Sequence, residues 1–344
     1  MKYIRNFSAH TDYEAEMSKI PTPSVSYCRK ENECHFMPSN VIMFKVGDLN
    51  GNTNQTVTVY YGMESVYDPR ITDEIPITEG NRWYVYSIPS GKSLNRIKGI
   101  KEITDTIISA KINSIFDDLI DSSYGNVSFI DCDISEMTSM YKMFDFCRSP
   151  QIFGINNWNV SNITNMMSVF EDCHSLQNLD LSTWNVENVT RMDSMFYECN
   201  SLQNLVGLSN WNVGKVEDMM MMFEDCHSLQ NLVGLSNWDV SSVTTMQQMF
   251  YGCHSLQNLD LNNWNVSSVT TMSWMFCRCT KLQTLSLNGW DLTNVTNTNM
   301  KSMFNRCDSL KTIFMRGCNQ TTIDKIKAQL KTDGILNNVT IITE

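Results

Sequence analysis

The sequence lacks long apolar runs, an excess of basic charge and any run of like charge long enough to form a charged tail. No stretch approaches the ~18 apolar residues that a membrane-spanning helix needs, and residues 1–20 hold no apolar segment of the kind that signal peptides carry. The formal net charge is -11, whereas nucleic-acid-binding proteins usually carry clusters of Lys and Arg. We therefore expect no signal peptide, no membrane insertion and no nucleic-acid binding.

Catalytic patterns are also missing from the sequence. We find no paired carboxylates placed in a cleft, no Ser/His/Asp spacing and no phosphate-binding loop. An enzyme would need its site in the β-rich segment of residues 41–90, where no such group of residues occurs. Because 42% of the residues are apolar, the chain can still bury a sizeable core. We predict a folded, non-enzymatic protein with no cofactor and no metal site.

What the sequence does contain is a repeat. The string Met-Phe-x-x-Cys, with Val for Met once, recurs at spacings of 26, 26, 27, 27, 26 and 28 residues. Its aromatic residues are Phe144, Phe170, Phe196, Phe223, Phe250, Phe276 and Phe304, and Trp recurs in step at 158, 184, 211, 238, 264 and 290. A fixed period of this length predicts units that stack on one another and bury a continuous core.

Each repeat has the pattern of a strand and a helix. In the copy that starts at Trp184, the apolar residues fall at i, i+3, i+4 and i+7, which is one face of a helix: Met192, Met195, Phe196 and Cys199. Leu179 and Leu181 alternate with polar residues, which predicts a short strand. Because paired strands lie ~4.8 Å apart and packed helices ~8–10 Å apart, we expect the stack to curve, with a concave sheet and a convex helical back.

The fold class that these patterns predict is α/β. We expect a curved leucine-rich-repeat solenoid, with a short parallel strand plus a helix per repeat, preceded by a small β-rich N-terminal domain. The predicted segments are an N-terminal docking segment over 1–40, a small β-rich domain over 41–93, a degenerate cap leading into the repeats over 94–131, seven solenoid units over 132–318 and a C-terminal helix-strand cap over 319–344.

Local patterns outside the repeats predict further elements. Residues 11–14 have the spacing of a capping box that starts a helix. Residues 24–28 and 34–37 are expected to form a hairpin. Alternation between turn residues predicts strands over 41–46, 56–61, 71–77 and 83–88. After the repeats, a closing helix is expected over 322–330 and a final strand over 338–342.

Seven of the twelve cysteines recur at one repeat position: Cys147, Cys173, Cys199, Cys226, Cys253, Cys279 and Cys307. Metal sites or stacked disulfides are one interpretation, but the expected helix spacing of ~8–10 Å exceeds the ~7 Å limit between disulfide-bonded Cα atoms. We therefore predict buried core thiols. His174, His227 and His254 each follow such a Cys. We expect them exposed at a turn rather than on zinc, because adjacent His and Cys point apart.

Other repeat positions have simpler interpretations. The Trp residues are expected to stack half buried along one edge of the solenoid, with a carbohydrate-binding platform as the alternative. The Asn or Asp after each Trp is expected to satisfy backbone groups of the turn. Gly207 and Gly234 accompany one-residue insertions, which indicates a bulge. One or two residues of the run from Met219 to Met222 must face solvent, which predicts an exposed hydrophobic contact.

The polar positions of the predicted strands form the candidate partner-binding surface. They are Gln177, Asn178, Asp180, Gln203, Asn204, Gln230, Asn231, Gln257, Asn258, Asp260 and Gln283. Their regular spacing suits contacts with a protein or a glycan, and it is equally compatible with a sheet face that is only solvated.

The repeat unit resembles the BspA-like leucine-rich repeats, in the variant with Met-Phe-x-x-Cys and Trp-Asn-Val-Ser. Residues 158–166, Trp-Asn-Val-Ser-Asn-Ile-Thr-Asn-Met, and 253–261, Cys-His-Ser-Leu-Gln-Asn-Leu-Asp-Leu, carry this resemblance. It covers a little over half of the chain. The resemblance implies a surface-exposed adhesion or interaction protein without catalytic residues.

Both ends of the chain are similar to segments of proteins from gut Bacteroides and their crAss-like phages, in residues 3–7, 13–15, 26–28 and 315–342. Together with the missing signal peptide, this similarity favours a phage virion appendage, in the head or in a tail fibre, assembled in the host cytoplasm. Its partners would be other virion proteins or a host-surface protein or glycan, and a homo-oligomer, by analogy a trimer, is expected. The alternative is a BspA-like protein at the bacterial cell surface, with a glycan as a further ligand class.

Overall fold

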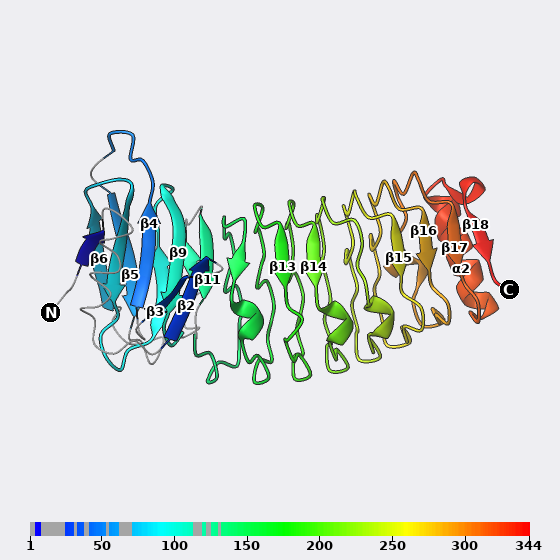
Figure 1. Cartoon of the computed structure of the whole chain (residues 1–344). Coiled ribbons are helices and arrows are strands. Elements are labelled where there is room, and N and C mark those ends of the chain that lie inside the picture. Colours follow the sequence, from blue (N-terminus) through cyan, green and yellow to red (C-terminus); the bar gives the residue numbers. More distant parts are fainter. Residues whose placement is uncertain are drawn as a thin grey trace. The chain divides into compact units, whose positions relative to one another are not determined.

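The computed structural model describes residues 4–7, 25–30, 33–37, 41–52, 55–61, 71–112, 119–121, 125–129 and 132–344. The chain divides into two compact units, Met1–Met137 with Phe146–Asn159, and Thr138–Asp145 with Val160–Glu344. Strands dominate the first unit, whereas the second consists mainly of turns with short strands and one α-helix (Figure 1). The helix predicted to start at residues 11–14 lies outside the described residues.

The first unit is built from β-sheets. One sheet has the order β1 (Ile4–Phe7), β7 (Arg82–Ser87), β4 (Val41–Val46), β9 (Ile103–Ser109), β11 (Asn126–Phe129) and β12 (Ile152–Phe153). A second has the order β10 (Ile120–Asp121), β8 (Leu94–Lys98), β5 (Gln55–Tyr61) and β6 (Ile71–Ile77), and β2 (Val25–Lys30) pairs with β3 (Glu33–Met37). The hairpin and the four strands predicted from alternation are thus confirmed.

Buried polar contacts connect the two larger sheets of this unit. The hydroxyls of Tyr61 on β5 and Tyr86 on β7 both donate to Oδ2 of Asp73 on β6, at 3.0 and 2.7 Å. Asp73 is 6% exposed, and a buried carboxylate needs such donors. Strands β8 and β9 pair with β5 and β4, so the boundary expected at residue 93 falls inside shared sheets.

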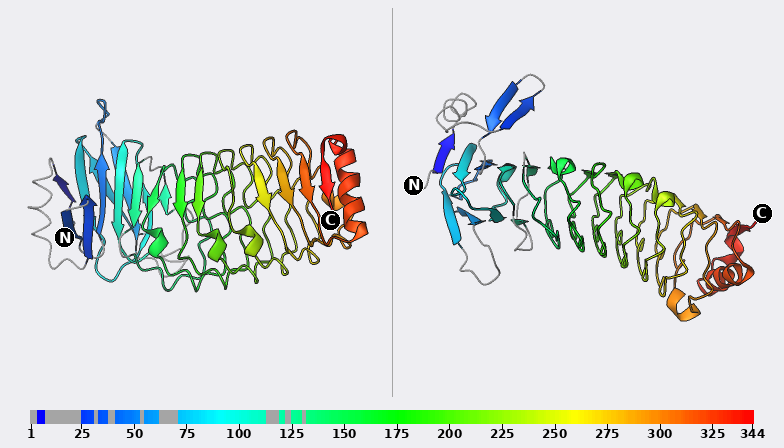
Figure 2. Two further views of the ribbon diagram at one scale, coloured as in Figure 1. Left: turned by 45° about the vertical axis from the view of Figure 1, so that its right-hand side comes forward. Right: turned by 90° about the horizontal axis from the view of Figure 1, so that it is seen from below.

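The second unit is a stack of repeats joined by parallel strands. β13 (Asn178–Asp180) pairs with β14 (Asn204–Val206), and β15 (Asn258–Asp260), β16 (Thr284–Ser286), β17 (Thr312–Phe314) and β18 (Thr340–Ile342) form a second parallel sheet. The register places equivalent residues opposite each other, as in Leu259, Leu285 and Ile313. Successive coils therefore lie side by side, as both views of Figure 2 show for this unit.

The predicted helix in each repeat is wrong. In the segment from Met192 to Cys199, Ser194 and Glu198 have left-handed φ values of 56° and 54°, which no α-helix contains. The N–H groups of Met192, Ser194, Phe196 and Glu198 donate instead to carbonyls of the next coil, at 2.8–3.1 Å. The residues between them close local turns with the carbonyl three residues back. Consecutive tight turns also direct Met, Phe and Cys inward. The apolar spacing alone therefore did not distinguish such turns from a helix.

Without a helix in each repeat, the stack has no helical side that would require wider spacing and make it curve. The Met-Phe-x-x-Cys side of each of the first six copies is hydrogen-bonded to the next coil, and the strand side is also paired between β13 and β14 and from β15 to β18, so neither side needs the wider spacing of packed helices. The Phe rings of successive copies stack with centroids only 5.3–5.8 Å apart. The concave sheet and convex helical back predicted from helix spacing therefore lose their physical basis.

Columns of identical side chains fill the core of the stack. The Cys thiols of the second to seventh copies donate to the Phe carbonyl of the preceding coil at 2.9–3.2 Å. All seven cysteines of this repeat position are free, which agrees with the predicted core role, although the 8–10 Å spacing used to argue for it was wrong. The Trp residues are buried rather than half buried, as for Trp264 at 0% exposure. Its indole N–H donates to a carbonyl of the preceding coil at 2.7 Å, so the column offers no platform to a carbohydrate.

Short helical turns complete the fold. Gly207 and Gly234 do not form bulges: with φ of 107° and 93° they start one-turn 3-10 helices, and a Cβ atom at either would lie 2.4 Å from the neighbouring coil. The 3-10 helices are η1 (Ile155–Asn157), η2 (Leu208–Asn210), η3 (Leu235–Asn237), η4 (Asn297–Met300) and η5 (Leu336–Asn338). Helix α2 (Gln320–Thr332) spans the range of the expected closing helix, with Asn319 accepting from the N–H of Thr322 at 2.8 Å.

Truncation of one stacked ring tests this core. Phe223 is fully buried between Phe196 and Phe250, so Phe223→Ala should lower the free energy of unfolding by about 3–5 kcal/mol. Gln230 is exposed, and Gln230→Ala should change it by less than about 0.5 kcal/mol. Urea denaturation of both variants measures the difference, and equal effects would contradict the assigned facing.

Candidate functional site

The residues predicted to bind a partner all lie exposed on the strand side of the repeats. Each of Gln177, Asn178, Asp180, Gln203, Asn204, Gln230, Asn231, Gln257, Asn258, Asp260 and Gln283 is exposed. Parallel register aligns those on β13 with β14 and those on β15 with the next strand, β16. The Gln203 N–H donates to the Gln177 carbonyl at 2.9 Å, and the Asn204 side chain donates to that of Asn178 at 2.6 Å. The copy that holds Gln230 and Asn231 forms no strand between these two sheets.

Two valines interrupt the polar strand face, and sequence reasoning missed them. Val206 and Val233 are 53% and 75% exposed, at the repeat position that Asp180 and Asp260 occupy in other copies. Both precede the glycines of the one-residue insertions, so aligning the copies position by position would have found them. They form an apolar pair with carboxylates at the equivalent positions on both sides along the stack.

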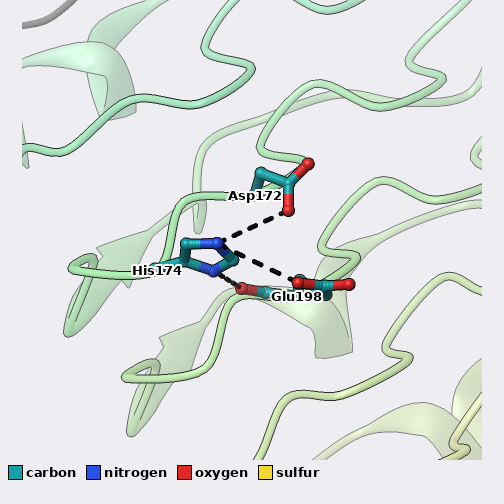
Figure 3. Close-up of side chains that lie close together, drawn as sticks. All are labelled: Asp172, His174 and Glu198. Carbon is teal, nitrogen blue, oxygen red and sulfur yellow. Dashed lines mark hydrogen bonds and ion pairs between the residues drawn. The ribbon is translucent and has the colours of Figure 1, made fainter.

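A second group of side chains lies where the Met-Phe-x-x-Cys segments end. Asp172 and His174 of one coil meet Glu198 of the next (Figure 3). The His174 Nε2 atom lies 3.6 Å from Oδ1 of Asp172 and 3.9 Å from Oε2 of Glu198, while Nδ1 lies 2.9 Å from the Glu198 carbonyl oxygen. Burial, and then the charge of Glu198, raise the pKa of Asp172 to about 6.

The other two predicted His residues have different surroundings. His227 Nε2 lies 3.3 Å from Oδ1 of Asp225, and its ring stacks on that of His254 at 4.6 Å. The Nδ1 atom of His254 lies 2.9 Å from the carbonyl oxygen of Arg278. All three His side chains are partly exposed while the Cys before each is buried, so adjacent His and Cys do point apart.

A shallow depression lies close to these residues, lined by Glu224, Asp225, Gln248, Tyr251, Trp274 and Arg278. Glu224 is 6% exposed, and its carboxylate accepts from Nε2 of Gln248 at 2.9 and 3.1 Å. Burial, followed by the charge of Asp225, raises the pKa of Glu224 to about 7. The guanidinium of Arg278 covers the Tyr251 ring at 5.5 Å, which shapes one wall.

The remaining predicted positions serve the turns and the core. The side chains of Asn185, Asn212, Asp239, Asn265 and Asp291 each accept from a backbone N–H two residues on, at 2.9–3.2 Å. The predicted role of this column in the turns is thereby confirmed. In the methionine run, Met219 and Met222 are buried and Met220 and Met221 are half-buried, so the run exposes less apolar surface than expected.

These features together define a repeat protein with a regular polar strand face. Residues 111–233 and 202–316 match a family described as Mycoplasma protein of unknown function, DUF285. Because the two matches together span more than half of the sequence, the chain belongs to this family.

A solved structure is weakly similar to this chain. A leucine-rich repeat protein of Leptospira interrogans is similar at 11% sequence identity, over 64% of this chain and 77% of that chain, with a TM-score of 0.20. A likeness at that score carries no argument. No curated protein matches the chain. Among the described residues, no helix is long and apolar enough to span a membrane.

Glu224 gives a testable pH dependence. Its pKa rises from 4.5 when exposed to about 7 in the fold. The folded state therefore holds the proton more tightly between these pH values, and the free energy of unfolding falls as the pH rises through them. Glu224→Gln keeps the contact with Gln248 and should flatten this fall, making the variant up to about 3 kcal/mol more stable than the parent above pH 7.

Urea denaturation across this pH range measures the effect. Glu217→Gln is the matched control because Glu217 is exposed. This substitution should leave the dependence of the free energy of unfolding on pH as it is in the parent. A parent-like profile for Glu224→Gln would show that the Glu224 carboxylate titrates normally.

Proposed function

We propose that this chain is a non-enzymatic interaction protein of the BspA-like leucine-rich-repeat type, which binds a partner protein on its polar strand face. The observation that carries the proposal is the face itself: exposed Gln and Asn side chains at equivalent positions of successive repeats, over a fully buried core. A surface held this rigidly loses little conformational entropy when a partner binds.

The exposed valines favour a protein over a glycan as the partner. Protein interfaces commonly combine a small apolar centre with a polar rim that excludes water. Val206 and Val233 supply such a centre, and Gln203, Gln230 and Asp260 lie around it as exposed polar residues. The buried Trp column removes the aromatic platform that a glycan-binding role would have used.

The setting of this interaction rests on resemblance alone. A phage virion appendage fits the similarity of both chain ends to phage proteins, and a bacterial surface protein fits the BspA-like repeats. A homo-oligomer, by analogy a trimer, remains part of the virion hypothesis. Mass spectrometry of purified virions distinguishes the two settings, because only the first requires this chain in the particle.

A double substitution tests the proposed surface. Val206→Ser with Val233→Ser places at both positions the residue that Ser286 already provides in another copy, and it adds no charge beside Asp180 and Asp260, so the fold should be preserved. Binding of the labelled full chain to intact Bacteroides cells should weaken by at least about tenfold, since hot-spot residues typically contribute 1.4 kcal/mol or more.

The controls separate the alternatives. Lys215→Ala, at an exposed position outside the polar strand face, should bind as the parent does. Protease treatment of the cells should abolish binding and periodate treatment should not. Binding that survives the double substitution, or that only periodate removes, would refute a protein partner on this face.

A further inference from the structure

The ring of His174 is oriented by the backbone of the next coil. A carbonyl oxygen only accepts, so the 2.9 Å contact with the Glu198 carbonyl requires the hydrogen on Nδ1. The Asn200 side chain also lies 3.1 Å from Nδ1. When the Asn200 amide group is flipped, its Oδ1 atom accepts a hydrogen bond from the Nδ1–H group of His174. Oδ1 of Asn200 is buried and otherwise has no partner. In the neutral ring, Nε2 therefore carries the lone pair.

The Nε2 atom lies near the carboxylates of both Asp172 and Glu198, as the dashed lines in Figure 3 show. The separations of 3.6 and 3.9 Å are longer than the usual hydrogen bond of about 2.7–3.2 Å, and neutral Nε2 has no hydrogen to donate. One ligand atom from each of the three residues lies within 4.8 Å of the other two. Around a tetrahedral ion with bonds of about 2.0–2.2 Å, neighbouring ligand atoms are about 3.3–3.6 Å apart, so small side-chain shifts would complete such a site.

The charges at this place also favour a bound cation. Lys142 lies 2.8 Å from the Asp145 carboxylate and 3.6 Å from that of Glu171, which offsets part of the negative charge of the adjacent acidic pair. For Asp172 and Glu198, the described residues provide no Lys or Arg within ion-pair distance. Their side chains are only 14% and 33% exposed, so water screens the repulsion between them incompletely.

We propose that Asp172, His174 and Glu198 bind one divalent transition-metal ion, with Zn²⁺ as the type. Imidazole selects metals of this class over Ca²⁺ and Mg²⁺. The contact between Nδ1 and a backbone carbonyl is the outer contact that metal-bound His residues usually make. The His174 side chain is 41% exposed, so the fourth coordination position faces solvent and can take water. The ion would link two neighbouring coils.

The repeat supplies a matched control within the same chain. Asp225 and His227 repeat the arrangement of Asp172 and His174, but Gly252 stands where Glu198 completes the first group. His254 is followed in the next coil by Arg278, whose charge disfavours a cation. Of the three His residues in the repeats, His174 is thus the one with a carboxylate in its own coil and in the next.

Calorimetric titration of the metal-depleted, untagged full chain with ZnCl₂ tests the site. The parent should bind one equivalent, and its Tm should rise with Zn²⁺. His174→Gln and Asp172→Asn should each weaken binding by at least about tenfold, and His227→Gln should bind as the parent does. Circular dichroism establishes that each variant is folded, and Glu198→Gln provides a further ligand substitution if one variant is not.

Cobalt spectroscopy guards against binding by the thiols. Co²⁺ in place of Zn²⁺ should show ligand-field bands without the charge-transfer band of a thiolate, because the column cysteines are buried and burial raises their pKa. The proposal is overturned by the absence of saturable binding, by a thiolate band, or by equal losses in His174→Gln and His227→Gln. None of these results bears on the polar strand face, so the metal site and the proposed partner binding stand or fall separately.

Discussion

Backbone hydrogen bonds between successive coils are the constraint on which the rest of this structure depends. On one side they form short parallel strands such as β13 and β14. On the other, alternate N–H groups of the Met-Phe-x-x-Cys segment donate to the next coil, as from Phe196 to Met222 at 3.0 Å. The coils are therefore held at the spacing of paired strands, and the backbone polar groups of the core segments find partners without a helix.

This spacing dictates which side chains can occupy the core. Aromatic rings about 5–6 Å apart can only stack, and the Phe rings do so with planes 4–12° apart. A thiol is small enough to reach the carbonyl of the coil before it, as Cys226 reaches Phe196 at 3.2 Å. The repetition of the sequence follows from this packing, because each side chain packs against its own copy.

Positions that point outward escape this constraint and carry the differences between copies. The strand position held by Asp180 becomes Val206 and Val233 in two adjacent copies, which places an apolar pair on a polar face. The turn position held by Glu198 is Gly252 in a later copy, which leaves His227 without a second carboxylate from the next coil. The proposed partner surface and the proposed metal site both rest on these departures from the repeat, which the constant core columns support.

The sequence by itself determined the repeat, its period, the inward Met, Phe and Cys residues, and a hairpin and four strands of the first unit, because apolar periodicity and turn residues are local signals. It did not distinguish a helix from consecutive tight turns: residues spaced like Met192, Met195 and Phe196 point the same way in both. Only the tertiary structure decided this, through the left-handed residues Ser194 and Glu198 and the hydrogen bonds to the next coil. It likewise decided that Asp172, His174 and Glu198 meet, since their proximity depends on the distance between coils, which no single repeat encodes.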